Sequence, residues 1–131
     1  MRFLLDTHFV IDLIDDVRYG LSEPGLFERA QEQGDLVVSV ISLWEVEIKS
    51  RIGKLHLNRG VQSWPQLLAE ASVELLAFSG EHVLADIGPE PDHKDPFDRA
   101  LLSVAAYEGC RLLTEDAVLS RHPLAWRPFP L

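Results

Sequence analysis

The chain has 131 residues, 47% of them hydrophobic, so its length and composition suit a single compact domain over residues 1–131. One cysteine, Cys110, excludes an intramolecular disulfide framework and suits a reducing, cytoplasmic location. No stretch reaches the ~18 apolar residues of a membrane span, and a net charge of −9 lacks the basic character usual in nucleic-acid binders.

Short apolar runs alternate with amphipathic stretches along the chain. In order, the patterns predict a strand over 2–5, helices over 7–16 and 23–32, a strand over 36–40, helices over 42–52 and 61–72, a strand over 73–78, a helix over 80–87, a loop over 88–92, a helix over 97–108, a strand over 111–114, a short helix from 117 and a last strand near 126–129. Pro65 either kinks its helix or marks the true first turn. Strands separated by helices predict an α/β/α fold with a central parallel sheet of four to five strands.

Acidic residues recur where predicted strands give way to helices. Asp6 follows the first strand, Glu45 lies one turn into the helix after the second, and Asp116 closely follows the fourth. Sites in parallel sheets form beyond the carboxyl ends of the strands, so these three should share one edge, whereas Asp98 begins a helix that could face either end. Converging acids repel unless a hard cation with oxygen ligands lies between them, so a divalent-metal enzyme is the leading hypothesis.

Each acid also has a purely structural interpretation as a helix cap. Residues 42–45 fit a capping box, Asp95 fits an N-cap before a proline, and Asp6 and Asp116 could cap the helices that follow them. Capping alone does not explain why acids recur at these junctions beside hydroxyl residues. The hydroxyl neighbours are Thr7, Ser42 and Thr114.

Four stretches that together span essentially the whole chain carry a family pattern. They are LLDTHFVIDLI, VVSVISLWEVEIKSRIGKLHL, HKDPFDRALLSVAAYEG and LLTEDAVLS. In this order and at these spacings they resemble the PIN-domain family, specifically the VapC-like ribonuclease toxins of bacterial toxin–antitoxin modules. Ser103 and Asp92 depart mildly from the family pattern. Neither is one of the acids at the predicted strand–helix junctions.

The resemblance implies a PIN-like fold and an enzyme, a metal-dependent ribonuclease that hydrolyses RNA phosphodiester bonds by metal-activated water, with Mg²⁺ or Mn²⁺ as cofactor. The family's acidic quartet, catalytic and metal-binding, falls on Asp6, Glu45, Asp98 and Asp116. Asp95 either joins the metal ligands or only caps its helix. Supporting roles fall on the hydroxyls of Thr7 and Thr114 and on Arg99 as a phosphate contact.

The resemblance also implies partners. These are an RNA substrate, a second copy in a homodimer, and a cognate VapB-like antitoxin that inhibits the toxin within a hetero-oligomer. The first two predicted helices carry more apolar residues than one face readily buries, so these residues either complete the core or offer the antitoxin a groove. They are Phe9, Val10, Leu13, Ile14, Leu26 and Phe27.

Three alternatives remain open. A free-standing PIN-type nuclease could act on other RNA or on flapped DNA, although flap nucleases usually carry helical arches for which 131 residues leave little room. A receiver-like domain needs an acceptor aspartate at the third strand and a late lysine, and residues 77–79 and the C-terminal strand offer neither. A catalytically silent binding module would keep the fold and lose an acid, whereas all four are present.

Overall fold

A computed structural model describes residues 1–15, 26–92 and 94–127. Its sheet has the strand order β3-β2-β1-β4, with every neighbouring pair parallel. The strands are β1 (Arg2–Leu5), β2 (Asp35–Ser39), β3 (Glu74–Leu76) and β4 (Arg111–Leu113). The predicted parallel sheet and α/β class are therefore confirmed, with four strands.

The fifth strand predicted near 126–129 does not form in its described part. Only an isolated parallel bridge joins Ala125 to Leu112, and the Trp126 N–H donates to the Leu112 carbonyl at 2.9 Å. Residues 128–131, which the prediction also included in part, lie outside the described part of the chain.

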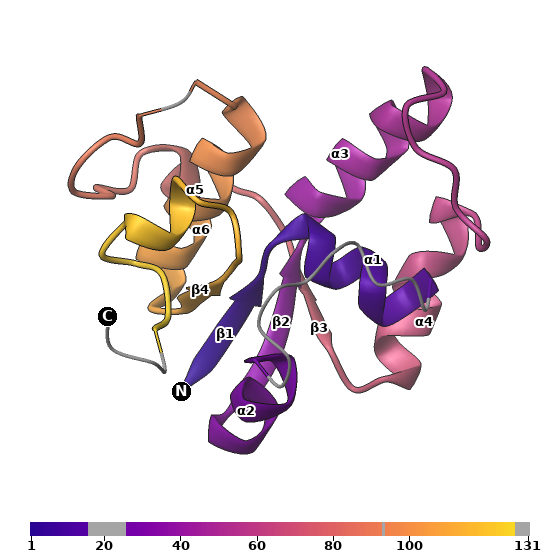
Figure 1. The fold of residues 1–131 in the computed structure, drawn as a ribbon, viewed down its shortest axis with the longest axis horizontal. Coiled ribbons are helices and arrows are strands. Elements are labelled where there is room, and N and C mark those ends of the chain that lie inside the picture. Colours follow the sequence, from indigo (N-terminus) through magenta and orange to yellow (C-terminus); the bar gives the residue numbers. More distant parts are fainter. Residues whose placement is uncertain (16–25, 93, 128–131) are drawn as a thin grey trace.

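Helices cover both faces of the sheet (Figure 1). They are α1 (Thr7–Asp15), α2 (Leu26–Gln33), α3 (Val40–Arg51), α4 (Trp64–Glu70), α5 (Gly80–Val83) and α6 (Pro96–Glu108), with 3₁₀ turns at Val61–Ser63 and Leu119–Arg121. Side chains alternate between the faces of each strand, so the sheet separates two cores. Phe3 and Leu5 pack with α1 and α4 on one side, whereas Leu4 packs with α6 on the other.

Several boundaries differ from the sequence prediction for local reasons. Helix α3 begins at Val40 because Ser39 is its N-cap and accepts a hydrogen bond from the Ile41 N–H at 3.0 Å, so the capping-box interpretation of residues 42–45 is wrong. Helix α5 ends at Val83 rather than at residue 87. Pro65 lies in the first turn of α4, which confirms the first-turn alternative.

The apolar excess of the first helix belongs to the core. Phe9, Val10 and Ile14 are buried, so the suggestion that they form a groove for a partner is wrong, and Leu13 is partly buried. The side chains of Leu26 and Phe27 lie outside the described part of the structure. Among the described residues, no helix is long and apolar enough to span a membrane.

Candidate functional site

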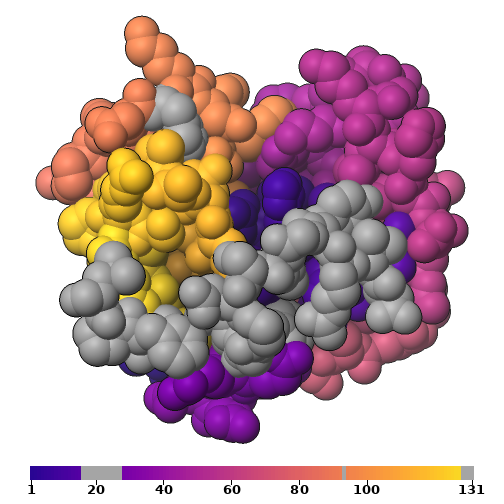
Figure 2. All heavy atoms as spheres, viewed as in Figure 1, coloured from indigo at the N-terminus to yellow at the C-terminus, as the bar shows by residue number. Residues whose placement is uncertain are grey.

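The sheet order places two site segments side by side. Strand β1 lies between β2 and β4, and Asp6 and Thr114 directly follow the adjacent carboxyl ends of β1 and β4. The Thr114 hydroxyl donates to Asp6 Oδ2 at 2.6 Å, and the Asp6 N–H donates to the Leu113 carbonyl at 2.9 Å. In Figure 2, indigo N-terminal residues reach the surface between the magenta and the yellow-orange parts of the molecule.

The Asp6 carboxylate is buried and held by few donors. Its Oδ1 accepts the Thr7 N–H at 2.7 Å, and only 8% of the residue is exposed. Burial raises the pKa of the Asp6 carboxyl, against the lowering effect of the hydrogen bonds from Thr114 and Thr7, and the charge of Glu45 adds to the rise. The fold therefore works against the charged form of Asp6, and a cation bound beside this carboxylate would stabilise that form.

Glu45 joins Asp6 through the residue between β1 and α1. The Thr7 hydroxyl donates to Glu45 Oε1 at 2.8 Å, while the Ser42 hydroxyl lies 3.0 Å from the same Thr7 oxygen. All three side chains are buried. Sequence reasoning assigned Ser42 to a helix cap, whereas one turn of α3 places it on the inner face beside Glu45.

Lys49 was given no role at the site from the sequence. Its ammonium lies 2.5 Å from Glu45 Oε2, one helical turn along α3. Burial lowers the pKa of the Lys49 ammonium, yet that pKa is raised overall by the hydrogen bond and charge of Glu45 and by the charges of Asp95 and Asp98. The glutamate-to-lysine spacing of four residues was the signal that could have identified the pair.

The first turn of α6 faces the same edge of the sheet. Helix α6 leads into β4 and packs against α3, and the rings of Phe97 and Trp44 meet edge-to-face with centroids 5.5 Å apart. A helix that returns to the start of a parallel strand runs opposite to that strand, so its own N-terminus lies near the carboxyl edge. This orientation settles the placement of Asp98 that the sequence left open, and Asp98 is partly exposed there.

Asp95 caps a helix, and Asp116 stabilises the turn that follows it. Asp95 Oδ1 accepts the N–H groups of Phe97 and Asp98 at 2.9 and 3.3 Å, so it is the N-cap of α6. Asp116 Oδ1 accepts two N–H groups of the turn that follows it, at 2.8 and 2.9 Å. The Asp116 N–H donates to the Thr114 hydroxyl at 3.0 Å, which connects Asp116 to Asp6 through one side chain.

Arg99 forms other contacts in this structure. Its Nε and Nη2 atoms lie 2.9 and 3.2 Å from the two carboxylate oxygens of Glu90, and its Nη1 donates to the Ser103 hydroxyl. A phosphate contact would therefore require Arg99 to leave Glu90, and that role stays a prediction.

The donor set suits a hard divalent cation in chemistry and place. Four carboxylates lie at one edge of the sheet, and the pKa of one of them, Asp6, is raised by its burial. Within residues 1–15, 26–92 and 94–127, however, no three acidic, histidine or cysteine side chains gather closely enough to share an ion as they stand. The Lys49 ammonium occupies one oxygen of Glu45 instead.

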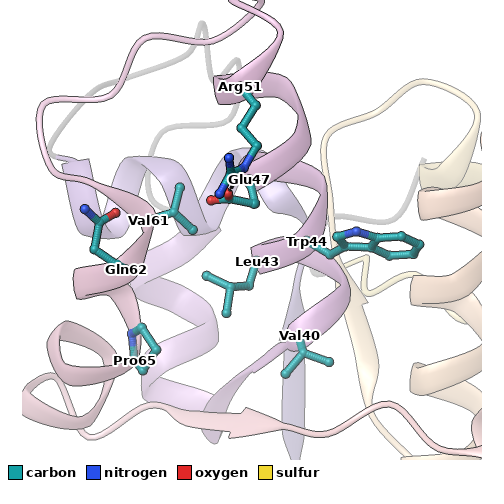
Figure 3. Close-up of a pocket in the computed structure, with 8 residues that line it drawn as sticks. All are labelled: Val40, Leu43, Trp44, Glu47, Arg51, Val61, Gln62 and Pro65. Carbon is teal, nitrogen blue, oxygen red and sulfur yellow. Dashed lines mark hydrogen bonds and ion pairs between the residues drawn. The ribbon is translucent and has the colours of Figure 1, made fainter.

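A separate cavity of about 450 Å³ opens on another face of α3 (Figure 3). None of the four acids lines it, and Figure 3 shows the Trp44 ring pointing away from the other lining residues. The cavity is lined by Val40, Leu43, Trp44, Glu47, Arg51, Val61, Gln62 and Pro65.

Comparison with known proteins places this fold. The model of the PIN domain matches residues 3–123. No curated protein matches the chain. Two solved structures share the fold, each at 18% identity and a TM-score of 0.58: VapBC2 from Rickettsia felis bound to a DNA fragment from their promoter, with 95% of this chain and 96% of that chain covered, and a toxin–antitoxin complex from Klebsiella pneumoniae, with 98% of each chain covered.

Proposed function

This chain belongs to the PIN-domain family, and we propose that it is a Mg²⁺- or Mn²⁺-dependent endoribonuclease, the toxin of a VapBC-type toxin–antitoxin module. The observation that carries the proposal is the continuous hydrogen-bonded series from Asp116 through Thr114, Asp6 and Thr7 to Glu45. A set of structural caps would not need to be connected in this way. We further propose one domain over residues 1–131, a homodimer, and action in the cytoplasm.

The residues divide the work by burial and position. Asp6 and Asp98 would be the main metal ligands, with Glu45 and Asp116 as further ligands or as acceptors that orient water. Thr7 and Thr114 orient the Asp6 carboxylate. The Thr7 N–H donates to one of its oxygens and the Thr114 hydroxyl to the other. A bound Mg²⁺ or Mn²⁺ would lower the pKa of water and stabilise the negative charge of the phosphate during hydrolysis.

An aromatic pair beside the acids, of which Trp44 is exposed and Phe97 is partly buried, supports a nucleic-acid substrate. Trp44 and Phe97 immediately precede Glu45 and Asp98 in the chain and contact each other, and 58% of Trp44 is exposed. Aromatic side chains beside a nuclease site can stack unpaired bases, worth ~1–3 kcal/mol per base. The pair therefore favours a single-stranded segment over a small phosphodiester.

The test is to sequence RNA 5′ ends after induced expression of the wild-type chain and of Asp6→Asn. New 5′ ends at defined positions with the wild type alone are the expected result. If neither chain produces new RNA ends while the purified wild type cuts flapped DNA, the alternative of a free-standing DNA nuclease is favoured.

Asp95 and Asp98 should separate cleanly by mutation. Asp95→Ser keeps an N-cap oxygen for α6 and should retain most activity with a thermal stability close to that of the wild type. Asp98→Ser removes a proposed ligand and should lower kcat/KM by more than the ~100-fold typical of outer contacts at metal sites. Both values come from steady-state cleavage of a labelled RNA. Equal losses at the two positions would place Asp95 among the ligands.

A short antitoxin encoded beside this chain should bind it and abolish RNA cleavage. Two solved structures that share this fold are VapBC2 and a toxin–antitoxin complex, and a chain of net charge −9 should attract a basic tail. Association should therefore slow as salt rises, as measured by stopped-flow or surface plasmon resonance. A complex that keeps full cleavage would contradict the inhibitory role.

A further inference from the structure

We propose that Lys49 is the resident counter-ion of Glu45 and of the carboxylates in the first turn of α6, and that its ammonium leaves Glu45 when a divalent cation binds. The inference rests on the proposed metal-dependent function and extends it to the state of the site without metal. It assigns Lys49 a role in setting metal affinity.

The contacts of Glu45 leave no oxygen without a donor. Oε2 lies 2.5 Å from the Lys49 ammonium, and Oε1 accepts the Thr7 hydroxyl at 2.8 Å. Glu45 is only 6% exposed, so solvent can do little to replace either donor. A cation that takes Oε2 must therefore compete with Lys49.

Acids from two helices act on the positive charge of Lys49. Glu45 lies one turn before it on α3, while Asp95 and Asp98 act on it electrostatically from the first turn of α6. Carboxylates gathered without a counter-charge destabilise a fold. Lys49 offsets this repulsion with one charge, which a divalent cation would exceed while coordinating the oxygens directly.

A different role for the contact between Lys49 and Glu45 predicts the opposite change in metal affinity. If Lys49 stays in place and only orients Glu45 for the metal, its removal should weaken metal binding, as losses of outer contacts do. Metal affinity measured without RNA therefore distinguishes a displaced counter-ion from a positioning residue.

The same helix provides a matched control. Arg51 pairs with Glu47 at the same four-residue spacing, but 79% of the Arg51 side chain is exposed, and Figure 3 shows this pair on the cavity side of α3. Lys49→Met and Arg51→Met each remove one cation from α3. Only the first should change the acidic site.

The experiment measures Mn²⁺ affinity by calorimetry and thermal stability without metal, on the wild type and both variants. Lys49→Met should tighten Mn²⁺ binding by about 10-fold or more, on the scale of outer contacts at metal sites, and lower the Tm of the metal-free protein. Arg51→Met should leave both values near those of the wild type. Lys49→Gln keeps a hydrogen-bond donor without the charge, so it should also tighten binding, and it serves if the Met variant does not fold.

Unchanged or weaker Mn²⁺ binding by the Lys49 variants would overturn the inference. The proposed metal-dependent function would still stand in that case if the wild type binds Mn²⁺ and Asp6→Asn does not. If the wild type itself binds no Mn²⁺, both proposals fall together.

Discussion

Replacing Asp6 by Asn should abolish RNA cleavage while leaving the protein folded. Asp6 directly follows β1 at the edge of the sheet where β4 also ends, and its two oxygens are already oriented by Thr7 and Thr114. Loss of a proposed direct ligand should lower kcat/KM by well over the ~100-fold that outer contacts cost at metal sites. Single-turnover cleavage of a labelled RNA at saturating Mg²⁺ measures the loss.

The same substitution should raise the stability of the metal-free protein. The pKa of Asp6 is raised by burial, so the folded state holds a proton that the unfolded state releases above its ordinary value of about 3.9. The wild type therefore loses unfolding free energy as pH rises through the window above that value, and the Asn variant escapes the loss. Urea titrations near pH 4 and pH 7 measure the difference. A strongly destabilised variant at pH 7 would instead support capping as the main role.

Asp15 provides the control for Asp6. It is another buried aspartate of the same N-terminal segment, but its oxygens accept the N–H groups of Asn58 and Arg59 at 2.6 and 2.9 Å. Asp15→Asn weakens these bonds and should cost about 1–2 kcal/mol of stability while cleavage is retained. Opposite effects of the two substitutions would separate a structural carboxylate from a functional one.

Chelation should abolish cleavage completely and reversibly. EDTA removes the cation that the four acids are proposed to share, and Mg²⁺ or Mn²⁺ should restore activity. Ca²⁺ should bind with looser geometry and support little turnover, since it tolerates irregular coordination. Gel-based cleavage of one RNA under each condition measures the effect, and undiminished cleavage in EDTA would exclude the metal mechanism.

The fold should survive this treatment. Lys49 already neutralises part of the acidic set without metal, so circular dichroism in EDTA should match that of the untreated protein. Asp6→Asn should show no cleavage under any of these conditions. Restoration of its activity by Mn²⁺ would move Asp6 out of the ligand set.

The α/β class and the candidate acids follow from sequence patterns alone. Period-2 and period-3.6 patterns are local, so the alternation of strands and helices could be read directly, as could the N-cap of Asp95 before a proline. The motifs carrying Asp6, Glu45, Asp98 and Asp116 predicted the PIN family, which the match over residues 3–123 confirms. Helix ends were less accurate, because Ser39 and Ser42 are both good caps and only one can begin α3.

Only tertiary packing brings the segments that carry those acids to one edge of the sheet. Strand order is a long-range property, so only the placement of β1 between β2 and β4 brings Thr114 within 2.6 Å of Asp6. The packing of α6 on α3 likewise decided which end of the sheet Asp98 faces. The role of Lys49 could not be predicted from the sequence either, because a glutamate and a lysine four residues apart are common on exposed helices. The burial of Glu45 and the approach of α6, which no local pattern contains, place this pair within the candidate site.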